Sequence, residues 1–149
     1  MSRQDTLIKV VELQAPQSRV WQALTDYRQF GEWFRVDLNE PFAPGSRSTG
    51  LTTYPGYEGY EWLATIETME PESLFSFHWH HDNVDAHLPL AQRPTTRVEF
   101  RLEPIDGGTR LTITESGFAA LPDDSRDSII RNNTQGWDIQ AEHIKAYVS

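Results

Sequence analysis

The order of patterned segments along the chain constrains the fold more than any other feature of the sequence. Residues 6–13 mix apolar and polar side chains as a half-buried strand does, and a proline-initiated helical pattern follows over residues 16–26. The middle of the chain then alternates with the strand period, and the chain after residue 124 has the helical period. This order predicts a curved antiparallel sheet that packs against one long final helix and leaves a cavity between them.

Periodicity and turn residues place the individual elements. A second short helix is expected over residues 26–33, and strands over residues 46–54, 60–69, 74–80, 96–103 and 110–116. Asp106-Gly107-Gly108 predicts a tight hairpin between the last two strands. Residues 81–94 are irregular, and a long loop beside the open end of a sheet is often a rim or a lid. We expect one α+β domain that spans residues 1–149.

Composition excludes several classes of partner. The formal net charge is −9, so the surface repels nucleic-acid phosphates and anionic lipid headgroups. No apolar run approaches transmembrane length, and the residues after Met1 are polar rather than a signal core. The chain contains no cysteine, which excludes disulfides, thiolate nucleophiles and Cys-ligated metals. We therefore expect a cytoplasmic protein that binds neither nucleic acid nor a membrane.

A series of short motifs resembles one known family. They are Ala15-Pro16, Val20-Trp21-Gln22-Ala23-Leu24-Thr25-Asp26, Trp33-Phe34, Leu74-Phe75-Ser76-Phe77-His78-Trp79, Ser116-Gly117-Phe118 and Gly136-Trp137. In their order and spacing they resemble the activator-of-heat-shock-protein-90-ATPase-like group of the START-related, pollen-allergen-like (SRPBCC) superfamily. The resemblance covers nearly the whole chain and implies a helix-grip fold, in which the C-terminal helix grips a curved sheet around a cavity. It implies little about activity, because superfamily members bind lipids, hormones or polyketides, catalyse cyclisation or hydrolysis, or act as chaperone partners.

Aromatic side chains form the first candidate ligand-binding site. Alternation places one aromatic set on a single face of the predicted strands, opposite Trp137 of the final helix. A helix over a curved sheet cannot fill all the space beneath it, and aromatic walls suit a flat or apolar guest. The alternative is that the rings simply fill the core. The candidate ligand-binding residues are Tyr60, Trp62, Phe75, Phe77, Trp79, Phe100, Ile113, Glu115, Asn133, Trp137 and Gln140.

Glu115 is the candidate catalytic residue. It shares strand parity with Leu111 and Ile113, which points it toward the space between sheet and helix. A carboxyl group in that space would be desolvated and its pKa raised, as a general acid or base requires. Asn133 and Gln140, on the inner side of the final helix, are candidate polar partners. The alternative is that the strand ends here and the carboxylate reaches water.

The stretch His78-Trp79-His80-His81-Asp82, followed by Asp85 and His87, is the candidate metal site. Two histidines at i and i+2 on a strand can share one metal, and Asp82 or His87 could complete the ligand set. However, His78 and His80 lie on the strand face opposite the aromatic residues, and the spacing matches no established motif. We therefore predict solvated histidines at a strand end, with no metal site and no cofactor.

The function that the sequence predicts is binding of a small, largely hydrophobic or aromatic molecule in a cavity between the sheet and the C-terminal helix. One alternative is a cofactor-independent cyclase or hydrolase that uses Glu115 as acid or base. Another is a chaperone-interaction module with a protein partner. An edge strand could also pair two copies as a homodimer, although the charged residues along the strands oppose uncontrolled association.

Overall fold

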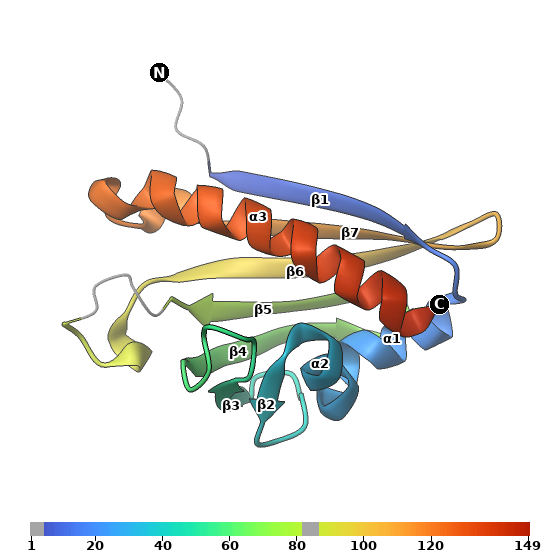
Figure 1. Cartoon of the computed structure of the whole chain (residues 1–149), viewed down its shortest axis with the longest axis horizontal. Helices are drawn as coiled ribbons and strands as arrows, with labels where there is room; N and C mark the ends of the chain where they lie inside the picture. Colours follow the sequence, from blue (N-terminus) through green and yellow to red (C-terminus); the bar gives the residue numbers. More distant parts are fainter. Residues whose placement is uncertain (1–4, 82–86) are drawn as a thin grey trace.

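A long helix lies lengthwise across a curved antiparallel sheet in the computed structural model, which describes residues 5–81 and 87–149 (Figure 1). The strands are β1 (Thr6–Leu13), β2 (Val36–Leu38), β3 (Arg47–Thr52), β4 (Glu61–Glu70), β5 (Leu74–His80), β6 (Thr95–Ile105) and β7 (Gly108–Ser116). The helices are α1 (Gln17–Thr25), α2 (Tyr27–Phe34) and α3 (Asp123–Val148), with 3-10 turns η1 (Leu90–Gln92) and η2 (Phe118–Ala120). This arrangement confirms the predicted α+β helix-grip fold.

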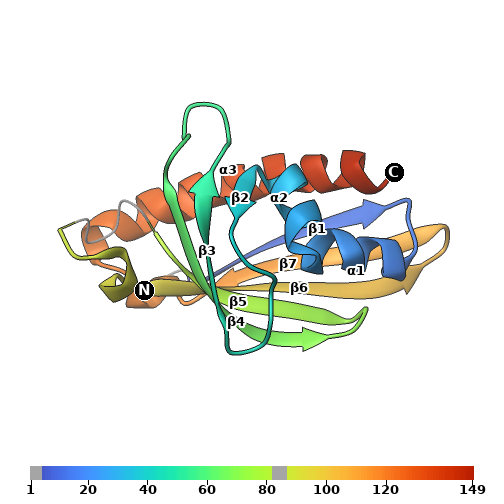
Figure 2. The same cartoon turned by 90° about the horizontal axis from the view of Figure 1, so that it is seen from below.

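The strand order β1-β7-β6-β5-β4-β3-β2 brings the start of the chain beside β7, near its end. Each neighbouring pair is antiparallel, and the β4–β5 register shifts between Ile66 and Thr68. Such an irregularity bends a strand and increases its twist. The helices α1 and α2 follow β1, and the connection between β3 and β4 extends past the side of α3 (Figure 2).

Strand alternation separates a buried inner face from a charged outer face. In β6, Val98, Phe100 and Leu102 are buried against the helices. On the outer face the Arg97 guanidinium donates to Glu67 at 2.7 Å and to Glu99 at 3.1 Å. The period of two therefore decides which side chains the helices cover.

Arg126 anchors the start of α3. Pro122 precedes the first turn and provides no side-chain cap, and Asp123 and Asp124 lie in that first turn. The buried Arg126 guanidinium instead donates to the carbonyl oxygens of Phe118 and Leu121, at 3.0 and 2.8 Å, and to the Asp123 carboxylate at 2.7 Å.

None of the helices in residues 5–81 and 87–149 is long and apolar enough to cross a bilayer.

Two details of the sequence prediction were wrong. Val36–Leu38 forms β2, which is too short for a period to be visible in the sequence. Tyr60 was expected to begin an inward-facing run with Trp62, but it lies before β4 and is 50% exposed. The reason is the left-handed backbone of Gly59 (φ 85°), which keeps the chain in a turn until Tyr60.

Candidate functional site

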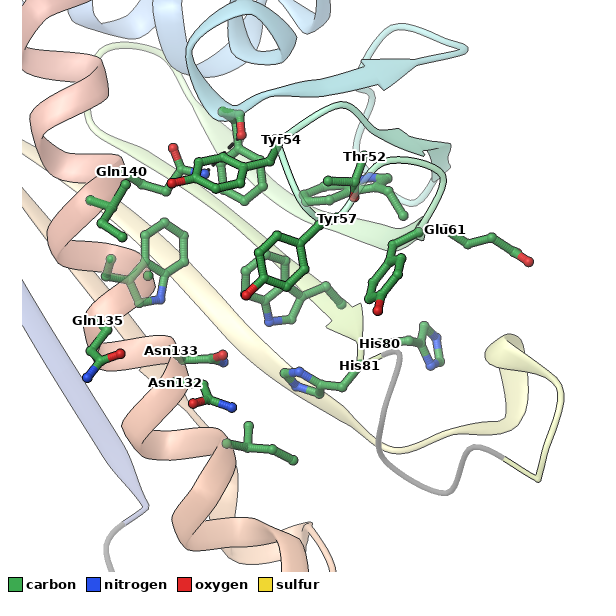
Figure 3. A pocket seen from close by; sticks show the side chains of 18 of the residues that line it. Thr52, Tyr54, Tyr57, Glu61, His80, His81, Asn132, Asn133, Gln135 and Gln140 are labelled. Carbon is green, nitrogen blue, oxygen red and sulfur yellow. Dashed lines mark hydrogen bonds between the residues drawn. The ribbon is translucent and has the colours of Figure 1, made fainter.

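A pocket of about 610 Å³ opens between α3, the β3–β4 connection and the end of β5 (Figure 3). Its volume lies in the range of small-molecule binding sites. It is lined by Phe34, Thr52, Tyr54, Tyr57, Tyr60, Glu61, Trp62, Leu63, Trp79, His80, His81, Ile129, Asn132, Asn133, Gln135, Gly136, Trp137, Ile139 and Gln140.

Aromatic rings form the floor of this pocket. The indoles of Trp79 and Trp137 stack with centroids 5.6 Å apart and an interplanar angle of 23°. Trp62 meets Trp79 edge-on at 5.6 Å, and Phe34 lies 5.4 Å from Trp62 and 6.1 Å from Trp137. Ring pairs at these separations stabilise one another, so the floor is one continuous aromatic surface.

Three tyrosines from the β3–β4 connection form the rim. Tyr57 lies 5.9 Å from Tyr54 and 5.8 Å from Tyr60 between ring centroids. Tyr57 and Tyr60 are both half-exposed, and Figure 3 shows the Tyr57 ring above the floor. Phenol groups at a pocket mouth supply both a ring face and a hydroxyl, so the rim is able to contact apolar and polar parts of a guest.

Gly136 leaves the α3 wall of the pocket open. A glycine inside a helix costs about 0.5–1 kcal/mol relative to alanine. A Cβ atom added at Gly136 would meet no atom within 4 Å, so no close packing requires the glycine. The missing side chain instead leaves empty space on the pocket side of the helix.

Glu115 lies beneath the floor and holds it together. Its carboxylate is completely buried and is not part of the pocket lining. Oε1 accepts from the Trp137 indole at 2.9 Å, Oε2 accepts from the Trp79 indole at 2.9 Å, and the Asn133 amide donates to both oxygens at 3.0 Å. The Thr96 hydroxyl is also hydrogen-bonded to Oε2 at 2.5 Å. One carboxylate therefore orients three side chains that do line the pocket.

Burial raises the pKa of Glu115, and the hydrogen bonds from Thr96, Trp137, Trp79 and Asn133 oppose this effect. All four donors are uncharged, so no cation compensates the desolvation of the carboxylate. A group of this kind is costly to bury, and such groups gather at functional sites. The sequence predicted the inward direction of Glu115 from strand parity, whereas its position behind two indoles depends on the packing of α3.

His81, which the sequence pattern placed only in the candidate metal site, joins this network. Its Nε2 lies 2.9 Å from the Thr96 hydroxyl, and the residue is buried and lines the pocket. Burial lowers the pKa of His81 to about 4, so the imidazole is neutral near pH 7. One sequence signal could have identified His81 as a pocket residue, namely its position directly after an aromatic strand. Binding residues are often found in the loops that follow the strands of a sheet.

The predicted ligand-binding residues separate into two groups. Those that line the pocket are Tyr60, Trp62, Trp79, Asn133, Trp137 and Gln140. Those that are completely buried and outside the lining are Phe75, Phe77, Phe100, Ile113 and Glu115. Gln140 also donates to the Phe34 carbonyl at 2.9 Å, which ties α3 to the end of α2.

The candidate metal ligands have separate protein partners. His78 Nε2 is bonded to Glu67 at 2.9 Å, and this bond is the main reason that the pKa of Glu67 falls to about 2. His80 Nδ1 is bonded to the Arg93 carbonyl at 2.7 Å. Within residues 5–81 and 87–149, no group of three His, Cys, Asp or Glu side chains is placed to hold a metal. Asp82 and Asp85 lie outside the described residues.

Comparison with known proteins identifies one matching family. The family model described as "Activator of Hsp90 ATPase homolog 1-like protein" matches residues 14–149. A search of curated proteins found no match.

Three solved structures illustrate the structural likeness. Protein MLL2253 from Mesorhizobium loti is 24% identical, with 95% of each chain covered and a TM-score of 0.77. Protein Ms6760 from Mycobacterium smegmatis is 22% identical over 97% of this chain and 90% of that one, with a TM-score of 0.77. The Aha1 dimer from Colwellia psychrerythraea is 17% identical over 97% and 96%, with a TM-score of 0.71.

Proposed function

The chain belongs to the Activator of Hsp90 ATPase homolog 1-like family, and we propose that it binds a small, flat, largely apolar molecule on the indole floor of its pocket. The observation that carries this proposal is the joint position of Trp62, Trp79 and Trp137 at the bottom of an open space of about 610 Å³. Large aromatic rings are normally buried against other side chains. Trp62 and Trp137 are buried here and Trp79 is partly buried, yet all three also line a volume that a ligand could fill.

The Glu115 network supports a binding role for this floor. An ordinary core would hold the two stacked indoles with apolar contacts alone, without a buried carboxylate. Hydrogen bonds from Trp79 and Trp137 to one carboxylate instead restrict how each ring can rotate. A preorganised surface loses less entropy when a ligand binds, which is the benefit that offsets the buried charge.

The charged residues that line the pocket limit the class of ligand that it can bind. Among the described residues that line the pocket, none is Lys or Arg. Glu61 is a lining residue, and Figure 3 shows its carboxylate turned away from the floor. An anionic ligand would lose its hydration without gaining a cationic partner. A neutral aromatic molecule fits the pocket better than a fatty acid does.

A protein partner is also compatible with family membership, and a dimer is described for the Colwellia relative. The aromatic floor favours the small molecule, because protein interfaces are typically flat surfaces rather than pockets of this volume.

The test is a ligand screen in which the pocket is closed from the helix side. Neutral polycyclic aromatics, flavonoids, steroids and fatty acids are titrated with tryptophan fluorescence and thermal shift as readouts. Gly136→Leu should keep the fold and abolish binding, since the added side chain enters open space. Ala146→Leu places the same side chain on the exposed face of α3, outside the lining, and should bind like wild type. Equal affinity in the two variants would refute the pocket.

A further inference from the structure

We propose that His81, Thr96 and Glu115 form a proton relay, with His81 Nδ1 as the group that accepts a proton from a molecule in the pocket. This inference rests on the proposed function, because the molecule must occupy the pocket. It adds a chemical activity, proton abstraction, to simple binding. It also gives Glu115 a different role from a direct acid or base, since Glu115 does not line the pocket.

The hydrogen-bond chain fixes the direction of each proton. The indole N–H of Trp79 can only donate, and it lies 2.9 Å from both Thr96 Oγ1 and Glu115 Oε2. The Thr96 hydroxyl has one proton, and with Glu115 ionised that proton points to Oε2. The Thr96 oxygen must then accept from His81 Nε2–H at 2.9 Å. Donors and acceptors are all satisfied in this single arrangement.

The consequence is an unprotonated Nδ1 on His81, a residue that lines the pocket. With the proton on Nε2, the acceptor of the neutral ring is Nδ1. Within the described part of the chain, no protein donor is bonded to this nitrogen. Figure 3 shows the His81 ring pointing toward Asn133 across the lower end of the pocket. Both residues line the pocket, so a ligand seated between them would lie beside the His81 ring.

The proton step balances without any added reagent. The C–H bond of the ligand breaks, its electron pair stays on the ligand, and an N–H bond forms at His81 Nδ1. The Nε2 proton passes to the Thr96 oxygen as the Thr96 proton passes to Glu115 Oε2. The net result is a ligand anion, a neutral imidazole in its other tautomer, and a neutral Glu115. Returning the proton to another carbon of the ligand would complete an isomerisation.

Burial favours the final protonation states of the two protein groups, a neutral His81 and a neutral Glu115. It lowers the pKa of His81, so the imidazole does not retain the proton, and it raises the pKa of Glu115, so the carboxylate receives it. The lining residues include no Lys or Arg to stabilise the ligand anion. The substrate must therefore spread its own negative charge over an aromatic system. The chemical class that fits is an aromatic ketone with an acidic C–H between the ring and the carbonyl.

The experiment uses 2-tetralone, a flat bicyclic ketone of this class. The full-length protein is mixed with it in D₂O, and proton NMR follows the loss of the signal from the C–H group between ring and carbonyl. We expect exchange at least ten times faster than in protein-free buffer. Thr96→Val removes the hydroxyl at constant shape and should lose this acceleration, whereas Thr96→Ser should retain it. His81→Gln and Glu115→Gln should also lose it, while the exposed His87→Gln should not.

The outcomes separate this inference from the proposed function. Circular dichroism and melting curves first establish that each variant is folded. Quenching of tryptophan fluorescence by 2-tetralone without accelerated exchange would overturn the relay and leave the binding pocket standing. Equal exchange in wild type and Thr96→Val would also overturn it. Failure of 2-tetralone to bind would overturn the assigned substrate class, whereas failure of every ligand in the screen would overturn the proposed function itself.

Discussion

The carboxylate of Glu115 on β7 accepts a hydrogen bond of 2.9 Å from the indole N–H of Trp137 on α3. A second indole, that of Trp79 on β5, is bonded to the other carboxylate oxygen. The sheet and the long helix therefore share one buried charge directly below the pocket floor. Stability, pH response and ligand binding should all depend on this contact.

Stability should decrease with rising pH because of Glu115. Its pKa in the folded protein is raised above the ordinary value of 4.5, so the folded state binds the proton more tightly than the unfolded state. The resulting stabilisation is complete below pH 4.5 and is lost as the pH rises through the folded pKa. Urea unfolding across this range should show the decrease in wild type and lose it in Glu115→Gln. The exposed Glu103→Gln is the matched control, and an unchanged slope in Glu115→Gln would contradict the assignment.

His81 should produce the opposite dependence at acid pH. Its pKa falls from 6.5 to about 4, so the unfolded state binds the proton more readily. Stability contributed by the neutral ring is present above pH 6.5 and is lost as the pH falls toward 4, by about 3 kcal/mol. The free energy of unfolding, measured by denaturant titration at several pH values, should fall more steeply in wild type than in His81→Gln within this window. Parallel curves for the two proteins would show that His81 titrates normally.

Gly136→Ala should stabilise the protein by about 0.5–1 kcal/mol, because alanine is the better helix former and its Cβ enters open space. Thermal unfolding measures the gain. A lower melting temperature in Gly136→Ala would mean that the wall of α3 is tightly packed at this point and that the pocket is not open there.

Phe77 and Trp79 should respond differently to substitution, although they share one face of β5. Phe77 is completely buried, so Phe77→Ala should cost about 3–5 kcal/mol through loss of core packing. Trp79→Phe keeps a ring but removes the N–H that bonds to Glu115, so it should weaken ligand binding more than stability. Unfolding curves and fluorescence titrations on both variants test this prediction. It would be wrong if Phe77→Ala and Trp79→Phe each lost binding and stability in the same proportion.

Zinc should not raise the melting temperature. The ring nitrogens of His78 and His80 are bonded to different partners, the Glu67 carboxylate and the Arg93 carbonyl. Because the Glu67 cluster is partly exposed, His78→Ala should cost less than about 1 kcal/mol. Thermal shift with and without zinc checks the first point, using the His78→Ala, His80→Ala double variant as control. A zinc-dependent rise that this variant abolishes would establish a metal site.

Local periodicity was sufficient for most of the fold. Thr6–Leu13 and Leu74–His80 were predicted with the bounds that β1 and β5 have, because alternation in a strand depends only on neighbouring residues. The same parity gave the inward direction of Glu115. Three-residue β2 was missed, since so short a segment contains less than two full periods.

Local patterns in the sequence were enough to predict the strands other than β2, the long helix, and most of the side chains that face inward. The tertiary structure alone decided which inward residues meet a ligand and which fill the core. Phe77 and Trp79 have identical parity, yet only Trp79 reaches the pocket, and His81 enters it from just beyond the strand. The physical reason is that side-chain direction is a local property of the backbone. Whether an inward side chain packs in the core or lines the pocket depends on where α3 crosses the sheet. The position of α3 is set by contacts between residues far apart in the chain.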